Sequence, residues 1–387
     1  MRFICQNCQS PIDILLKLDP ENVRWKITST GAQEINESDY SKANYFTDLH
    51  LDFPVYTDKY IPGQTPFMRA VMLIGTEKIL EYQQTLHLLD ATLDVKEDIN
   101  ALIRFYLGQK IDLFRKTIHK YLPLDEFPCE KPVDINRCLY MMLEWFFAPL
   151  HRPPDTFKFV DFCSKEISNL HENNPDNFYA FIDTLIDTNF LKNTQKDSLK
   201  LYPKLLKSEV ILRPTLFSDF IENPEGNLPV KISTSSFEIY KDLYKDLSEA
   251  ISRMLVLIAG ISNINMRGNF NTFNDQMSNM PTSLNKYVDV PLGSKIGFID
   301  DPKWNSFVEN VLDNKLRNSI AHYKVEYNEV TQIITCYPKL EGFKRERKIE
   351  LSFLEFTSKV LNQFRYLHRF NHIIKIFFVH HYLRKNP

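Results

Sequence analysis

The 387-residue sequence is poor in glycine and carries almost no net charge. It holds 10 glycines, and its 47 basic and 49 acidic side chains leave a formal net charge of −2. A chain this close to neutral has no general attraction for nucleic acid, so any contact with RNA has to come from a local basic patch.

Three other features are also missing. No apolar run reaches the roughly 20 residues that a membrane-spanning helix needs, and Asp13, Lys17 and Asp19 interrupt the apolar residues where a signal peptide would have its core. The 6 cysteines are scattered rather than arranged as a disulfide framework, which is typical of a reducing compartment. We therefore expect a cytoplasmic protein without membrane contact.

Helical periodicity dominates what is present, so the predicted fold class is mainly α. Residues 1–63 are mixed and polar, with strand-like pieces at 23–28 and 49–56. Residues 64–230 read as a helical sensor or partner-binding region, and a passage rich in proline and asparagine ends it near residue 230. Residues 231–387 begin with a long amphipathic pattern and form the third predicted part. The expected helices cover 67–93, 95–122, 133–150, 155–170, 175–191, 195–207 and 237–261.

The N-terminus carries a Cys-x-x-Cys motif, Cys5 and Cys8, preceded by an aromatic residue and followed by Pro11. This spacing is typical of half of a zinc knuckle, and it makes a structural zinc ion a candidate cofactor. No other cysteine pair has short spacing, and Cys129 and Cys138 would complete the site only if the fold returned them to it. Two free thiols in an N-terminal strand, or a redox pair, are the alternatives.

The stretch with most chemical content is Leu316 to His322. A helix is expected to start at Asp301-Pro302 and to run into this stretch with one apolar face. Arg317, Asn318 and His322 then lie at its end, with Asn318 and His322 one turn apart. A histidine can transfer a proton near neutral pH, and an arginine can hold a phosphate and stabilise the charge that develops on it. Alternatively, these three residues cap and solvate the end of a helix.

The sequence after the motif adds context. Residues 323–337 and 342–351 read as two strands of a β-hairpin, and Ser352 with Glu355 forms a capping box at the start of a long helix. This order of helix, Arg-Asn-(three residues)-His, hairpin and long helix resembles the C-terminal part of HEPN domains, which are helical bundles found in prokaryotic ribonucleases, toxins and antiviral effectors. The resemblance covers residues 235–384 and implies a HEPN-like bundle with a β-hairpin insertion.

The resemblance also implies a function. It points to a metal-independent endoribonuclease, a toxin or antiphage effector that leaves 2′,3′-cyclic phosphate and 5′-hydroxyl ends, with Arg317, Asn318 and His322 as catalytic residues. The implied partners are RNA, a second copy of the chain across a shared cleft, and an antitoxin or phage-derived trigger; catalysis requires no cofactor. The alternative is a non-catalytic subunit that binds RNA, a nucleotide or a protein and regulates a separate enzyme.

Two further patterns, one basic and one rich in histidine, are candidate binding sites. Lys344, Arg345, Arg347 and Lys348 lie on the second expected strand and are candidate RNA-binding residues, although neighbouring glutamates favour a solvated edge. His368 and His372 are one helical turn apart, a spacing that can bind a metal. No carboxylate accompanies them in a recognisable order, so the sequence makes no metal site of them.

Overall fold

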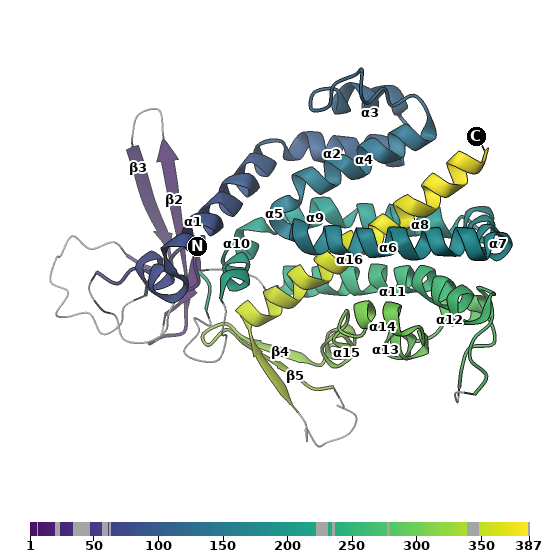
Figure 1. Ribbon diagram of the computed structural model, residues 1–387. Helices are drawn as coiled ribbons and strands as arrows, with labels where there is room; N and C mark the ends of the chain where they lie inside the picture. Colours follow the sequence, from purple (N-terminus) through teal and green to yellow (C-terminus); the bar gives the residue numbers. More distant parts are fainter. Residues whose placement is uncertain are drawn as a thin grey trace. The chain divides into compact units, whose positions relative to one another are not determined.

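The computed structural model describes residues 1–5, 7–19, 24–33, 47–55, 61, 63–221, 231–233, 237–276, 279–338 and 348–385. The protein is mostly helical, with two small antiparallel sheets of three strands each (Figure 1), as the predicted fold class required. It divides into two compact units, and each unit is assembled from separate stretches of the chain. The first unit contains residues 1–86, 208–242 and 318–361; the second contains 87–207, 243–317 and 362–387. These units cut across the three consecutive parts expected from the sequence.

The first unit contains both sheets. The N-terminal sheet has the order β1-β2-β3 and the other has the order β4-β5-β6, with antiparallel pairing throughout. Aromatic side chains form the core beside the second sheet, where the ring of Tyr327 lies 5.1 Å from Phe237 and 5.5 Å from Phe353. The strands are β1 (Arg2–Ile4), β2 (Pro11–Asp19), β3 (Arg24–Thr30), β4 (Val325–Asn328), β5 (Ile333–Cys336) and β6 (Ile349–Ser352).

The second unit is helical, and its helices form because apolar side chains recur at helical spacing. In α7, for example, Phe178, Phe181, Ile182 and Leu185 are all buried. The α-helices of the protein are α1 (Pro66–Asp94), α2 (Lys96–Leu107), α3 (Ile111–Ile118), α4 (Pro132–Phe146), α5 (Ala148–His151), α6 (Pro153–Asn173), α7 (Pro175–Asp187), α8 (Phe190–Leu199), α9 (Leu201–Lys207), α10 (Glu209–Phe217), α11 (Phe237–Arg267), α12 (Leu284–Val288), α13 (Leu292–Lys295), α14 (Pro302–Val308), α15 (Asn314–Ala321) and α16 (Phe353–Lys385).

The helix predicted from Pro302 to the motif is two helices. Its start is as expected, because the Asp301 side chain accepts a hydrogen bond from the backbone N–H of Lys303 at 3.0 Å. However, α14 ends at Val308, and Asp313 begins a new helix by accepting a hydrogen bond from the backbone N–H of Leu316 at 3.1 Å. The apolar spacing continues through the break, which is why the pattern alone did not reveal it.

The predicted β-hairpin is instead a three-stranded sheet. The expected strand at 323–337 folds back on itself, because Asn328 Oδ1 accepts hydrogen bonds from the backbone N–H groups of Val330 and Thr331 at 2.9 and 3.0 Å. This turn separates β4 from β5, and the expected strand at 342–351 overlaps β6, which pairs with β5.

The predicted capping box of α16 is confirmed: Glu355 accepts a hydrogen bond from the Ser352 backbone N–H at 2.6 Å, and Ser352 Oγ accepts one from the Glu355 backbone N–H at 3.1 Å.

Within the described residues, α11 is long and apolar enough to cross a membrane, and 89% of its apolar window is buried inside the protein. Core helices pass the same test of length and composition, so this one helix carries no argument for a membrane.

Candidate functional site

The predicted motif lies at the C-terminal end of α15. Leu316 and Ile320 are buried and anchor the helix, whereas the His322 side chain is exposed and Asn318 is half-buried. The backbone N–H of His322 donates to the carbonyl of Asn318 at 3.1 Å, and Tyr323 then ends the helix in the left-handed region with φ 56°. The imidazole therefore lies one residue beyond the end of α15 and is open to solvent.

Arg317 has a different environment. Its guanidinium forms an ion pair with Glu249 of α11, and the arginine side chain is 21% exposed. The boundary between the two compact units falls directly after Arg317, so Arg317 belongs to the second unit, whereas Asn318 and His322 belong to the first. Arg317 is thus already engaged with a carboxylate, which is the type of group that a phosphate would replace.

The predicted RNA-binding strand is described only at its end. Lys344, Arg345 and Arg347 lie outside the described residues. Lys348 is exposed and donates to Glu350 of β6 at 2.7 Å. This pairing is typical of a solvated strand edge, which is the alternative to an RNA-binding role.

The two N-terminal cysteines lie where the chain turns between β1 and β2. Cys8 is exposed, Cys5 is partly buried, and hydrogen bonds from Ser10, and to a lesser extent from Cys5, lower the pKa of Cys8 to about 7. Cys129 and Cys138 are buried in the second unit with their sulfur atoms 2.8 Å apart. Within the described part of the chain, no cysteine belongs to a group of three metal-ligand side chains.

A cluster that does meet this criterion lies in the second unit. Glu144 of α4 accepts hydrogen bonds at Oε2 from His368 Nε2 at 2.9 Å and from His372 Nε2 at 3.1 Å, both on α16. The potential ligand atoms of these three residues all lie within 4.8 Å of one another. The ring of His151, from α5, stacks on His368 with centroids 4.2 Å apart. We call these four residues the Glu144–histidine cluster.

The cluster is supported by a chain of buried hydrogen bonds. Tyr202 Oη lies 2.9 Å from His368 Nδ1 and accepts a hydrogen bond from Asn371 Nδ2 at 3.1 Å. Asn371 in turn accepts from Ser198 Oγ at 2.7 Å. This chain fixes the plane of the His368 ring from the side opposite Glu144.

Burial sets the charge of the cluster. It lowers the pKa of His151 and of His368 to about 4, and it lowers the pKa of His372 as well. Burial alone would raise the pKa of Glu144, but hydrogen bonds from His368 and His372 outweigh it and hold that pKa well below its usual value. Near neutral pH the cluster therefore consists of one carboxylate and three neutral imidazoles.

Only two of the four residues of this cluster form a pattern that can be recognised in the sequence. The spacing of His368 and His372 was visible, but Glu144 lies 224 residues before His368. No sequence pattern connects positions so far apart, because only the packing of α4 against α16 brings them together.

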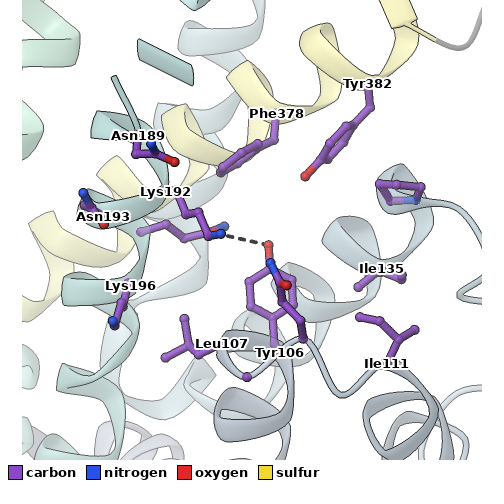
Figure 2. A pocket seen from close by; sticks show the side chains of 14 residues that line it. Tyr106, Leu107, Ile111, Ile135, Asn189, Lys192, Asn193, Lys196, Phe378 and Tyr382 are labelled. Atoms are coloured by element: carbon purple, nitrogen blue, oxygen red, sulfur yellow. Dashed lines mark hydrogen bonds between the residues drawn. The ribbon is translucent and has the colours of Figure 1, made fainter. Parts of the chain in front are cut away.

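The second unit also contains a cavity of about 1040 Å³. Figure 2 shows Lys192, Asn193 and Lys196 of α8 on one side and Ile111 and Ile135 on the other. Phe378 and Tyr382 of α16 also line it, and none of the lining residues is acidic. Neither lysine forms an ion pair with any described residue. The cavity thus combines positive charge with aromatic surface.

Comparisons with known proteins give no assignment: no protein-family model, no curated protein and no solved structure matches this chain.

Proposed function

We propose that the protein is a metal-independent endoribonuclease of the HEPN type, acting as a toxin or antiphage effector. The observation that carries the proposal is the exposed imidazole of His322 immediately after the last turn of α15, directly before the β4-β5-β6 sheet and the long helix α16. This order of elements resembles the C-terminal part of the family. In the proposed dimer, two such motifs share one cleft.

Each residue of the motif has a role in the proposed reaction. His322 takes the proton from the 2′-hydroxyl of the RNA or returns one to the leaving 5′-oxygen. The 2′-oxygen attacks the adjacent phosphorus, and the bond from phosphorus to the 5′-oxygen breaks. Arg317 stabilises the negative charge that grows on the phosphate, and Asn318 orients the phosphate or the imidazole. The products carry a 2′,3′-cyclic phosphate and a 5′-hydroxyl.

The ion pair between Arg317 and Glu249 fits a resting enzyme. A scissile phosphate has to replace Glu249 before Arg317 can act on it. Glu249 is about half exposed, so the carboxylate can move into water when it is displaced. An antitoxin or a phage-derived trigger would act on this step.

The internal nucleophile provides a direct test. An RNA oligonucleotide that is cut by the protein should become resistant when the nucleotide 5′ of the scissile bond is replaced by its 2′-deoxy form. The same oligonucleotide with the deoxy substitution several positions away is the matched control and should be cut normally. Cleavage of both substrates at the same bond would rule out the mechanism.

One observation favours a second function, nucleotide binding without cleavage. The cavity of the second unit pairs Lys192 and Lys196 with the rings of Phe378 and Tyr382, which suits a phosphate joined to a base. Under this proposal a fluorescent nucleotide should bind the wild-type protein and lose affinity in Lys192→Ala/Lys196→Ala. Lys158→Ala/Lys165→Ala, on α6 of the same unit, is the control of equal charge. This function would be ruled out if all three proteins bound the nucleotide equally, or if the wild-type protein did not bind it.

A further inference from the structure

The Glu144–histidine cluster has the composition and the geometry of a metal centre, and no part of the proposed ribonuclease reaction uses it. Two imidazoles and one carboxylate form a donor set that suits Zn²⁺ and Fe²⁺. His368 and His372 project from adjacent turns of α16, and Glu144 approaches them from α4. The donor atoms therefore come from two helices that an ion would clamp together.

The distances are close to those that a bound ion requires. A four-coordinate ion with bonds of about 2.0–2.1 Å places its ligand atoms roughly 3.4 Å apart. Glu144 Oε2 lies 2.9 Å from His368 Nε2 and 3.1 Å from His372 Nε2. An opening of a few tenths of an ångström, which a side-chain rotation supplies, would make room for the ion. His151 Nε2, at 3.4 Å from Glu144 Oε1, is the nearest additional donor.

The surroundings also match those of a metal centre. Histidines that bind a metal through one nitrogen commonly hydrogen-bond through the other, and this bond fixes the ring. His368 has such a contact with Tyr202, and the Asn371 amide holds the tyrosine in turn. Tyr202 Oη can accept from both groups, so His368 can carry its proton on Nδ1 instead of on Nε2, which frees Nε2 to bind the ion.

Hydrogen bonding alone leaves this cluster incompletely satisfied. Glu144 Oε1 is a buried atom without a hydrogen-bond partner among the described residues. A divalent cation between Glu144 and the two imidazoles would engage the carboxylate and offset its negative charge. The Glu144 side chain is 21% exposed, which gives the ion a route of entry.

We propose that Glu144, His368 and His372 bind one divalent transition-metal ion, which joins α4 to α16 and stabilises the second unit. This site is distinct from the ribonuclease motif and from the cysteines at the N-terminus. The result of an RNA cleavage assay therefore neither supports nor contradicts this metal site.

The test uses the full-length protein, stripped with EDTA and titrated with Co²⁺. We expect one ion per chain, visible ligand-field absorption without a thiolate charge-transfer band, and a higher melting temperature when the ion is bound. No stoichiometric uptake by the wild-type protein would overturn the proposal. A thiolate band that disappears in Cys5→Ser/Cys8→Ser would overturn it too, because it would place the ion on those cysteines.

Matched variants locate the ion. His368→Gln/His372→Gln should lose Co²⁺ uptake, whereas His171→Gln/His380→Gln, a pair in the same unit with rings 5.5 Å apart, should retain it. Uptake that survives in the first variant would contradict the assignment. Tyr202→Phe keeps all three ligands but removes the contact with His368, and we expect affinity to fall about 10-fold. If the double variant does not fold, the Tyr202→Phe affinity and the wild-type spectrum decide the outcome.

Discussion

At the scale of single residues, the ion pair of Arg317 with Glu249 controls how available the proposed phosphate-binding group is. Exposed and partly exposed ion pairs contribute about 0–1 kcal/mol. A phosphate that replaces the carboxylate has to overcome no more than this. Under the proposed mechanism, the Arg317–Glu249 pair is therefore weak enough for the phosphate of an RNA to displace it.

Glu249→Gln should tighten RNA binding by up to about five-fold, because the neutral amide holds Arg317 less strongly than the carboxylate does. Fluorescence anisotropy with a 2′-deoxy-substituted RNA measures the affinity without cleavage. Asp197→Asn, which weakens the ion pair of Arg253 on the same helix α11, is the control and should have no effect. Equal or weaker binding by Glu249→Gln would argue against phosphate binding by Arg317.

A second residue, Lys295, is expected to make the free energy of unfolding depend on pH in the alkaline range. It is 3% exposed, and its Nζ donates to the Ser252 hydroxyl at 3.2 Å. Burial lowers the pKa of Lys295 to about 8, with nearby Glu249 and Asp289 opposing part of that effect. In the unfolded chain the pKa returns to its usual value near 10.5. Between these two values the unfolded state binds more protons, so stability rises with pH.

From pH 7 to pH 9.5, wild type should therefore gain roughly 2 kcal/mol of unfolding free energy relative to Lys295→Met. Urea denaturation of both proteins at several pH values measures the difference, and the other titrating groups cancel in the comparison. A difference that stays constant with pH would show that Lys295 is not held at a lowered pKa.

At the scale of elements, the sequence predicted helices far better than their ends. The long apolar periodicities at 175–191 and 237–261 correspond to α7 and α11, because burial on one face imposes the pattern. The break between α14 and α15 and the turn between β4 and β5 were missed. Both depend on one short side chain, Asp313 or Asn328, which bonds to the backbone without changing the apolar spacing.

The contact between α11 and α7 depends on a glycine. A Cβ atom at Gly260 would overlap the ring of Phe181. Gly260→Ala should therefore destabilise the protein by about 1–3 kcal/mol, although alanine is the better helix former. Chemical denaturation measures the loss.

Phe181→Leu should restore part of that stability in the double variant, because the smaller side chain makes room for the new methyl group. Gly297→Ala is the matched control, since nothing lies within 4 Å of its Cβ position. A stabilised Gly260→Ala protein would contradict this account of the helix contact.

At the scale of the whole molecule, the chain builds each compact unit from three separate stretches. The Glu144–histidine cluster follows from this arrangement, because α4 and the second half of α16 belong to the same unit despite their distance in sequence. The residues of the Arg317 motif were accessible to sequence reasoning because they lie within six consecutive positions of the chain. The cluster was not, since its members share no local pattern.

The formal net charge of −2 also acts at this scale. Without a general attraction to RNA, the proposed recognition of RNA depends on local groups, and the proposed activity depends on a few side chains. The most direct test is therefore an RNA cleavage assay in the presence of EDTA, which compares wild type with Arg317→Ala, His322→Ala and His87→Ala. The last variant removes another exposed histidine, on α1.

We predict that wild type and His87→Ala cut RNA to cyclic-phosphate ends, and that Arg317→Ala and His322→Ala lose at least about 100-fold in rate while remaining folded. Cleavage by His322→Ala at the wild-type rate would contradict the proposed mechanism. Cleavage that EDTA abolishes while the protein stays folded would contradict its independence of metal.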